Sequence, residues 1–365
     1  MTRRRVLFVG RTRYRLPLAE NLARKFEALG EEFDVRVLAS AADGAPTQDA
    51  IFRLVPPLRP RVLDGVAFQL ALPFRAAREL RAFRPDAAVA QSPYEAAALL
   101  VARRLARTKT PIVLELHGDW RTATRLYGSP LRRGLSAVAD RVGATAVRRV
   151  EAVRTISEFT SSLVRAHEVE PAGVFPAYVD LSAFTATPPA PLPEEPRALF
   201  VGVLQRYKGV DVLVEAWHRV RERLPDARLR VVGQGPLAPL VTHLDVTASL
   251  SQAEVAGALD ESSLLVLPSR SEGLPRIVIE AFCRGRPVVG TRAGGIPDII
   301  RDGENGLLVP AEDAPALAAA LVRALGDRAL LQRLADGARE SARAWIQTPD
   351  EYAARMRDLV DSVAT

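Results

Sequence analysis

The sequence has little of what marks several large protein classes. Cys283 is the single cysteine among 365 residues, so no internal disulfide can form, which favours a reducing compartment. No apolar run approaches the roughly 20 residues of a membrane-spanning helix. The four histidines and one cysteine form no cluster of the kind that binds zinc. These absences argue against a disulfide-rich secreted protein and against a zinc enzyme, and we expect no metal and no cofactor.

Charge is distributed unevenly along the chain. Residues 1–180 contain 29 Lys and Arg against 19 Asp and Glu, whereas residues 181–365 contain 21 against 24. A basic half indicates contact with an anionic ligand or surface, although arginines on solvated faces explain it equally well. No aromatic-rich platform accompanies the charge, so we expect no nucleic-acid partner. The chain passes almost at once into an apolar run, without a secretory signal, and we expect a cytoplasmic protein.

Two α/β patterns follow one another along the chain. Strand-like runs alternate with helical spacing from residue 6 onward, and the alternation restarts at 198–201, which is typical of parallel sheets. The proline-rich segment 188–193 can continue neither a helix nor a central strand, so it is the best candidate for a linker. We therefore expect a first domain over 1–185, a second over 186–348 and a C-terminal helix over 349–365.

The most informative segment runs from Ser269 to Pro310. Glu272 and Glu280 are separated by seven residues, and a Gly-Leu-Pro turn lies between the first glutamate and a predicted helix that carries the second. A strand-like run at 287–290 and a Gly-Gly turn follow. Loops of this kind face the carboxyl ends of parallel strands, where open α/β sheets bind ligands.

Two such domains with these motifs resemble the retaining glycosyltransferases of the GT-B architecture, in the large family 4 that includes sucrose synthase-like and phosphatidylinositol mannosyltransferase-like enzymes. The likeness rests on the Glu-x7-Glu pair, on Arg-Pro-Val-Val-Gly-Thr and on Gly-Gly-Ile-Pro-Asp. It is strong over 198–310 and weak but collinear over 1–180.

The resemblance implies an α/β fold of two Rossmann-like doubly wound domains facing across a cleft, with the C-terminal helix crossing back to the first domain. It also implies transfer of a hexose from a nucleoside-diphosphate sugar to an acceptor hydroxyl with retained anomeric configuration, without a metal. The nucleotide sugar would bind mainly to the second domain, and the acceptor mainly to the first.

Roles for the motif residues follow from the same resemblance. Glu272 would contact the donor sugar and Glu280 the ribose, since carboxylates accept strong hydrogen bonds from hydroxyls. Backbone N–H groups of Gly273 and Leu274, followed by Pro275, suit sugar and phosphate oxygens at a helix start. A structural alternative stays open, in which Glu272 caps the helix and Glu280 is a first-turn acid favoured by the helix dipole.

A second loop, from Gly202 to Gly209, carries Lys208, which matches the family's diphosphate lysine. The family usually has an arginine where this chain has Val203. Arg206 either supplies the missing charge or points to solvent. Gly233 opens a Gly-Gln-Gly-Pro turn like the family's turn near the nucleotide, where glycines permit close backbone approach; a generic strand-ending turn is the alternative.

In the first half, His117 follows a strand at the position where the family often has a histidine that contacts the donor sugar, although a lone histidine there is often structural. Asp119 either orients the imidazole or binds the acceptor. A loop over 10–15 carries three arginines: Gly10 is assigned to the donor, and Arg11 and Arg13 to an anionic acceptor, because arginine forks bind phosphate and carboxylate. A solvated basic loop is the alternative.

A predicted helix over 132–150 sets arginines beside apolar residues, the arginines being Arg132, Arg133, Arg141, Arg148 and Arg149. Such a helix either lies on anionic lipid or is a domain helix with one buried stripe. A lipid-linked acceptor and peripheral contact with the inner membrane face therefore stay open. So do two other functions, a sugar-nucleotide epimerase of the same architecture and a non-catalytic nucleotide-sugar binder.

Overall fold

The computed structural model describes residues 3–59, 61–122 and 136–364, excepting the side chains of 61–63, and divides into two compact units. Unit 1 comprises Met1–Tyr178 and Gln347–Thr365, and unit 2 comprises Val179–Ile346. Unit 1 thus ends before residue 185, where the first domain was predicted to end. The reason is that Leu181 and Phe184 are buried in the core of unit 2.

Unit 1 is built on a parallel sheet with the strand order β3-β2-β1-β4-β5-β6-β7 within the described residues. The strands are β1 (Arg4–Tyr14), β2 (Phe33–Ala41), β3 (Phe52–Val55), β4 (Ala87–Ala90), β5 (Ile112–Leu116), β6 (Ala152–Thr155) and β7 (Gly173–Val174). The helices are α1 (Glu20–Glu32), α2 (Arg61–Phe83), α3 (Pro93–Ala106), α6 (Ser136–Arg149), α7 (Glu158–Arg165) and α14 (Pro349–Asp361). The central strands are almost wholly apolar because helices cover both faces of the sheet.

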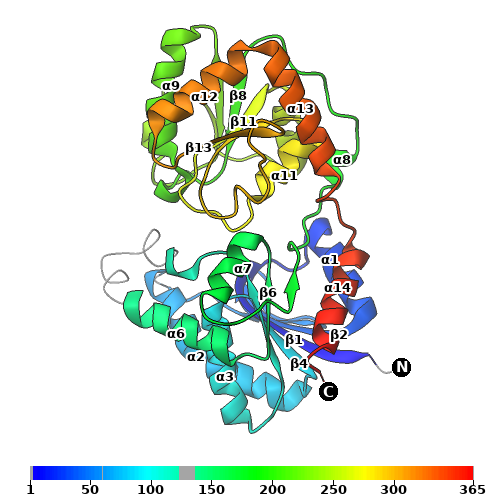
Figure 1. Cartoon of the computed structure of the whole chain (residues 1–365). Coiled ribbons are helices and arrows are strands. Elements are labelled where there is room, and N and C mark those ends of the chain that lie inside the picture. The colour runs from blue at the N-terminus through cyan, green and yellow to red at the C-terminus, as the bar shows by residue number, and fades with distance from the viewer. Residues whose placement is uncertain (1–2, 60, 123–135, 365) are drawn as a thin grey trace. The chain divides into compact units, whose positions relative to one another are not determined.

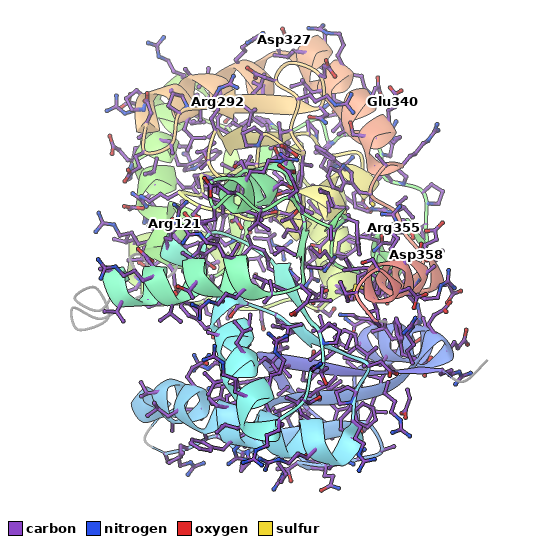
Figure 2. All side chains as sticks on the ribbon, turned by 60° about the horizontal axis from the view of Figure 1, so that its bottom comes forward. Arg121, Arg292, Asp327, Glu340, Arg355 and Asp358 are labelled. Carbon is purple, nitrogen blue, oxygen red and sulfur yellow. The ribbon has the colours of Figure 1, made fainter. Side chains whose placement is uncertain are left out.

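Helices α1 and α14 cover one face of this sheet, while α2, α3, α6 and α7 cover the other. Helix α14 lies beside α1 (Figure 1), and it buries Tyr352 and Met356 among the residues of the first face. Arg355 and Asp358 lie on its exposed side (Figure 2). The last helix of the chain is therefore part of unit 1, which confirms the predicted return of the C-terminal helix.

Unit 2 has a parallel sheet with the order β10-β9-β8-β11-β12-β13. Its strands are β8 (Arg197–Val201), β9 (Arg228–Val232), β10 (Asp245–Thr247), β11 (Leu264–Leu267), β12 (Val288–Thr291) and β13 (Gly306–Val309). Its helices are α8 (Ser182–Thr185), α9 (Val210–Arg223), α10 (Gln252–Asp260), α11 (Arg276–Cys283), α12 (Ala314–Gly326) and α13 (Arg328–Ala342), with the short 3₁₀ turns η1 (Arg206–Lys208) and η2 (Ala238–Val241).

Both strand orders reverse direction at one point, between β1 and β4 in unit 1 and between β8 and β11 in unit 2. At such a switch point the loops that leave the two strands run apart and open a crevice at their carboxyl ends. The predicted pair of doubly wound α/β domains is confirmed. The sequence analysis did not identify the short strands β3, β7, β10 and β13.

The segment over 10–15, predicted to be a loop, is mostly strand, because β1 continues to Tyr14 after a shift of register against β2. Tyr14 is buried, and its ring centroid lies 5.9 Å from that of Phe26 and 5.0 Å from that of Phe52. This aromatic contact anchors the segment. Arg11, Thr12 and Arg13, which precede Tyr14 on the strand, are all exposed.

The proline-rich segment 188–193, predicted to be a linker, is bound to unit 2. Arg286 is fully buried and donates to the carbonyls of Ala190 and Pro191 at 2.9 and 3.1 Å. Arg284 donates in the same way to the carbonyl of Pro188 at 3.0 Å. Proline removes a backbone donor but leaves the carbonyl free to accept, and these buried guanidinium groups use it.

We predict that Met356→Ala lowers the free energy of unfolding by about 2–5 kcal/mol, because the fully buried side chain leaves a cavity between α14 and the rest of unit 1. Met356→Leu, which nearly conserves volume, should cost less than about 1.5 kcal/mol. Urea unfolding of the full chain measures both. An unchanged midpoint for the alanine variant would mean that α14 contributes nothing to the core.

Candidate functional site

Lys208 and Glu272 come from different loops and meet at the switch point of unit 2. Lys208 lies at the end of η1 after β8, and Glu272 lies in the loop after β11. The Lys208 Nζ atom is 2.6 Å from Glu272 Oε1, and the two side chains are 14% and 12% exposed. Ser269 donates its hydroxyl to the same carboxylate oxygen at 2.8 Å. The structure thus brings together two of the residues predicted for the catalytic site, held by charge-assisted hydrogen bonds.

The Gly-Gly turn after β12 positions the backbone of Glu272. Gly294 has a φ of +55°, and a Cβ atom there would lie 2.1 Å from the Glu272 carbonyl oxygen. The next residue, Gly295, donates its backbone N–H to that same oxygen at 2.9 Å. Glycine is required at residue 294 both for its backbone conformation and for this close approach.

The turn after β9 packs directly on the loop after β8. A Cβ atom at Gly233 would lie 1.9 Å from the carbonyl oxygen of Gly202, and Leu204 donates its N–H to the Gln234 carbonyl at 3.0 Å. Gly233 therefore permits a close approach between two loops of the chain itself, and its predicted place near the nucleotide stays a prediction. Loops from four adjacent strands, β9, β8, β11 and β12, together form the carboxyl edge at this site.

Neither glutamate of the Glu-x7-Glu pair acts as a helix cap. The N-cap of α11 is Pro275, which makes no side-chain capping bond, and no acid lies in the first turn. Glu280 is instead in the second turn of α11, where burial raises its pKa against the opposing charge of Arg276, 3.8 Å away. The capping role considered for Glu272 and the first-turn role considered for Glu280 are therefore wrong. Gly273, Leu274 and Pro275 form the turn between them.

Sequence reasoning missed Arg270, which fastens the two main loops together. Its guanidinium is 10% exposed and donates to both carboxylate oxygens of Asp211, at 2.7 and 2.8 Å. It also donates to Glu312 at 2.8 Å, and its backbone N–H donates to the Tyr207 carbonyl at 2.7 Å. Arg270 therefore sets the position of η1, and so of Lys208, relative to the loop of Glu272.

Arg206 differs from Lys208, although both belong to η1. Its side chain is exposed and forms no ion pair with the described residues. Its carbonyl accepts a hydrogen bond from Arg270. Val203, which occupies the family's arginine position, is 43% exposed. Arg206, the other cation of this loop, therefore lies at the surface.

In unit 1, His117 lies near a buried acid that the sequence analysis did not single out. Its Nε2 atom lies 3.7 Å from Glu115 Oε2. Glu115 is buried on β5, where Arg154 at 2.5 Å, with His117 also contributing, holds the pKa of the carboxyl below its usual range despite burial. Tyr352 of α14 donates its hydroxyl to Glu115 at 3.4 Å. The imidazole itself is partly exposed.

Asp119 serves a local turn instead of the imidazole. It accepts hydrogen bonds from the Arg121 backbone N–H at 2.9 Å and from the Thr122 hydroxyl at 2.8 Å. Burial opposes ionisation of Asp119, but these bonds and the Arg121 guanidinium lower its pKa. Of the two acids beside His117, Glu115 is the one that lies against the ring.

The predicted residues on β1 lie at the switch point of unit 1. Gly10 packs against the Gln91 side chain, which follows β4. Arg13 lies 2.9 Å and Arg11 3.9 Å from a single buried carboxylate, Asp64. Backbone donation from Leu58 and the two arginines keep the pKa of Asp64 low, although burial opposes this. One carboxylate faces the guanidinium groups of two partly exposed arginines, so a net positive charge stays at this edge.

The predicted basic helix is only partly within the described residues. Leu131, Arg132, Arg133 and Leu135 lie outside them. Helix α6 carries the rest of the pattern, with Val147 buried but Val138 and Val142 exposed. Among the described residues, no cluster of His, Cys, Asp or Glu could hold a metal ion. None of the described helices has the length and hydropathy needed to cross a membrane.

Comparison with known proteins gives matches over both units. A family described as Glycosyltransferase Family 4 matches residues 18–183, and one described as Glycosyl transferases group 1 matches residues 195–327. A D-inositol 3-phosphate glycosyltransferase from Nocardioides sp. is 30% identical over 252 residues, which cover 59% of this chain and 54% of the relative. The chain spans between 30% and 54% of the length of the first curated relatives that it matches.

Solved structures share the fold over nearly the whole chain. Sucrose-phosphate synthase from Thermosynechococcus elongatus has a TM-score of 0.79 at 19% identity, covering 99% of both chains. HepE from Anabaena, solved in complex with UDP-glucose, has a TM-score of 0.71 at 18% identity, covering 97% of this chain and 99% of that one. At these identities the likeness shows a common two-domain fold.

We predict a coupling between Arg270 and Asp211 of about 0.5–3 kcal/mol in a double-mutant cycle of Arg270→Met and Asp211→Asn, read out by thermal unfolding. The exposed pair of Arg219 and Glu215 on α9 is the matched control, expected at about 0.3–0.5 kcal/mol. If the Arg270 and Asp211 effects simply add, the bidentate pair does not fasten the loops.

Proposed function

Because the chain belongs to the GT-B glycosyltransferases of family 4, we propose that it transfers a hexose from a nucleoside-diphosphate sugar to an acceptor hydroxyl with retention of anomeric configuration. The observation that carries the proposal is the Lys208–Glu272 pair at the switch point of unit 2. Epimerase and non-catalytic binder, the alternatives from the sequence, have no comparable support among the relatives.

The pair suits a donor that brings both a diphosphate and a sugar. The Lys208 ammonium is already desolvated beside Glu272, so an incoming diphosphate competes with that carboxylate for the same cation. The carboxylate then becomes free to accept hydrogen bonds from the sugar hydroxyls. Glu280, whose pKa is raised by burial, regains stabilisation of its charged form if ribose hydroxyls donate to it. The UDP-glucose complex of HepE makes uridine donors the first to test.

The proposed reaction mainly requires that the site stabilise the negative charge on the leaving diphosphate. A fixed cation stabilises that charge without rearranging during the reaction, which is the largest single effect in many enzymes. Lys208 meets this requirement because Arg270 holds its loop in place. Arg206 is a secondary source of charge. The proposal requires no enzyme nucleophile and no metal.

The acceptor is proposed to bind unit 1 and to be anionic. Support comes from the net positive charge that Arg11 and Arg13 leave around Asp64. Several relatives are named D-inositol 3-phosphate glycosyltransferases, so their acceptor carries a phosphate by name. His117, which lies 3.7 Å from Glu115, is proposed to contact the donor sugar, and Asp119 stays a weaker candidate for acceptor binding. A cytoplasmic location remains a prediction from the sequence.

A thermal-shift panel of nucleoside diphosphates and their sugars should name the donor. Ligand at about 100 times its dissociation constant stabilises the native state by roughly 2.7 kcal/mol. We expect uridine diphosphate and at least one uridine diphosphate sugar to raise the melting temperature. Matching nucleoside monophosphates, which lack the diphosphate that Lys208 binds, should have smaller effects. No shift with any nucleoside diphosphate would contradict the donor site.

Lys208→Ala should lower kcat by about 10²- to 10³-fold, since it removes the fixed cation opposite the leaving group. Arg219→Ala, an exposed arginine on α9, is the control and should leave the rate near that of the parent. Arg206→Ala should fall between the two. Initial rates of sugar transfer, with melting temperatures to check folding, measure all three, and near-parental turnover without Lys208 would remove it from the site.

A further inference from the structure

Helix α2 exposes a stripe of large apolar side chains. Val66, Leu70 and Phe74 are 53%, 71% and 69% exposed, and their spacing of four residues places them one above another on the same side of the helix. The buried side of the same helix carries Phe68 and Leu72 in the core of unit 1. The helix is therefore apolar on both sides, although a surface helix normally turns polar residues outward.

Two helices of the same layer also expose apolar side chains. Helix α3 packs against both α2 and α6 (Figure 1). The exposed apolar residues of the three helices, here called the outer face, are Val66, Leu70, Phe74, Val101, Leu105, Val138 and Val142. They are seven of the fourteen exposed large hydrophobic residues in the described part of the chain, so the exposed apolar side chains are concentrated on one layer of unit 1. Such concentration marks an interaction surface.

The exposed charged side chains on these three helices are all positive, whereas the acidic side chains are buried or partly buried. Of their acids, Asp64, Glu79 and Glu95 are buried at 6%, 5% and 3% exposure, and Asp140 is partly buried. The exposed charged residues with described side chains on the three helices are all arginines: Arg78, Arg81, Arg104, Arg141, Arg148 and Arg149. The layer therefore combines apolar side chains with positive charge and turns its carboxylates inward.

Arginines and apolar residues also share one groove on this layer. The groove lies between α3 and α6 and has a volume of about 510 Å³. Val101, Val138 and Val142 line it together with Arg104 and Arg141. The guanidinium groups thus lie within a side-chain length of the exposed apolar surface, as in peptides and helices that rest on lipid head groups.

We propose that the outer face of α2, α3 and α6 docks on an anionic phospholipid membrane. The apolar side chains enter the boundary between head groups and acyl chains, and the arginines pair with lipid phosphates and anionic head groups. A protein partner would need acidic groups matched one by one to the arginines, whereas a lipid surface supplies negative charge everywhere. The proposal goes beyond sugar transfer and does not depend on it. It widens the sequence prediction from the single helix over 132–150 to a face of three helices.

Co-sedimentation of the full chain with vesicles tests the proposal. We expect binding to vesicles of phosphatidylcholine mixed with phosphatidylglycerol, weaker binding to pure phosphatidylcholine, and loss of binding to the mixed vesicles as salt rises. Leu70→Ser with Phe74→Ser should lower the affinity for the mixed vesicles by about tenfold or more, since two large apolar side chains no longer leave water. Arg104→Gln with Arg141→Gln should reduce the preference for anionic vesicles.

Matched controls separate docking from folding. Leu240→Ser, at an exposed apolar residue of unit 2, and Arg219→Gln on α9 should bind vesicles like the parent chain. All variants change exposed side chains, so their melting temperatures should stay near the parent value. Parental vesicle binding by the Leu70/Phe74 variant, or no binding of the parent to anionic vesicles, would overturn the proposal. So would a dimer in light scattering that the same variant dissociates, because the face would then join two copies of the chain.

Discussion

The arrangement of unit 2 depends on one constraint, the reversal of strand order between β8 and β11. Loops that leave the two strands must run in opposite directions, and the space between them lies over the carboxyl ends of buried parallel strands. Lys208 and Glu272 enter that space from opposite sides and meet at 2.6 Å. Their pairing compensates the cost of partial burial, and the proposed donor needs both a cation and a carboxylate.

Buried and partly buried arginines hold the loops of both units in place. Arg270 joins the two loops of the candidate site through Asp211, while Arg284 and Arg286 hold the proline-rich segment to unit 2 through its carbonyl groups. Arg154 does the same in unit 1, where it holds Glu115 beside His117. A planar guanidinium offers five donors in a rigid fork, so one buried side chain can satisfy several acceptors from segments far apart in sequence. Part of the high arginine content thus serves to hold segments of the fold together.

The remaining arginines serve a different purpose on the surface. On α2, α3 and α6 they stand among exposed apolar residues, and the nearby carboxylates are turned inward. At the end of β1 they surround a single buried aspartate. Both arrangements leave positive charge uncompensated on unit 1, which gives a physical basis to the charge imbalance between the halves of the sequence. The first suits a lipid surface, and the second suits an anionic small molecule.

The sequence by itself determined the two doubly wound domains and the loops that carry Lys208, Glu272 and Gly233, because hydrophobic period, glycine turns and motif spacing are local properties. The return of the last helix was implied only by the family resemblance. The sequence did not determine that β1 continues past Gly10, that the proline-rich segment is bound to unit 2, that Arg270 joins the loops of the candidate site, or that Glu115 lies near His117. Those facts depend on partners far away in the chain, such as Phe52 for Tyr14 and Asp211 for Arg270. Only the folded chain brings such partners together. Which side chains are buried and which charges form pairs was therefore decided by the tertiary structure alone, whereas the hydrophobic period could be read from the sequence.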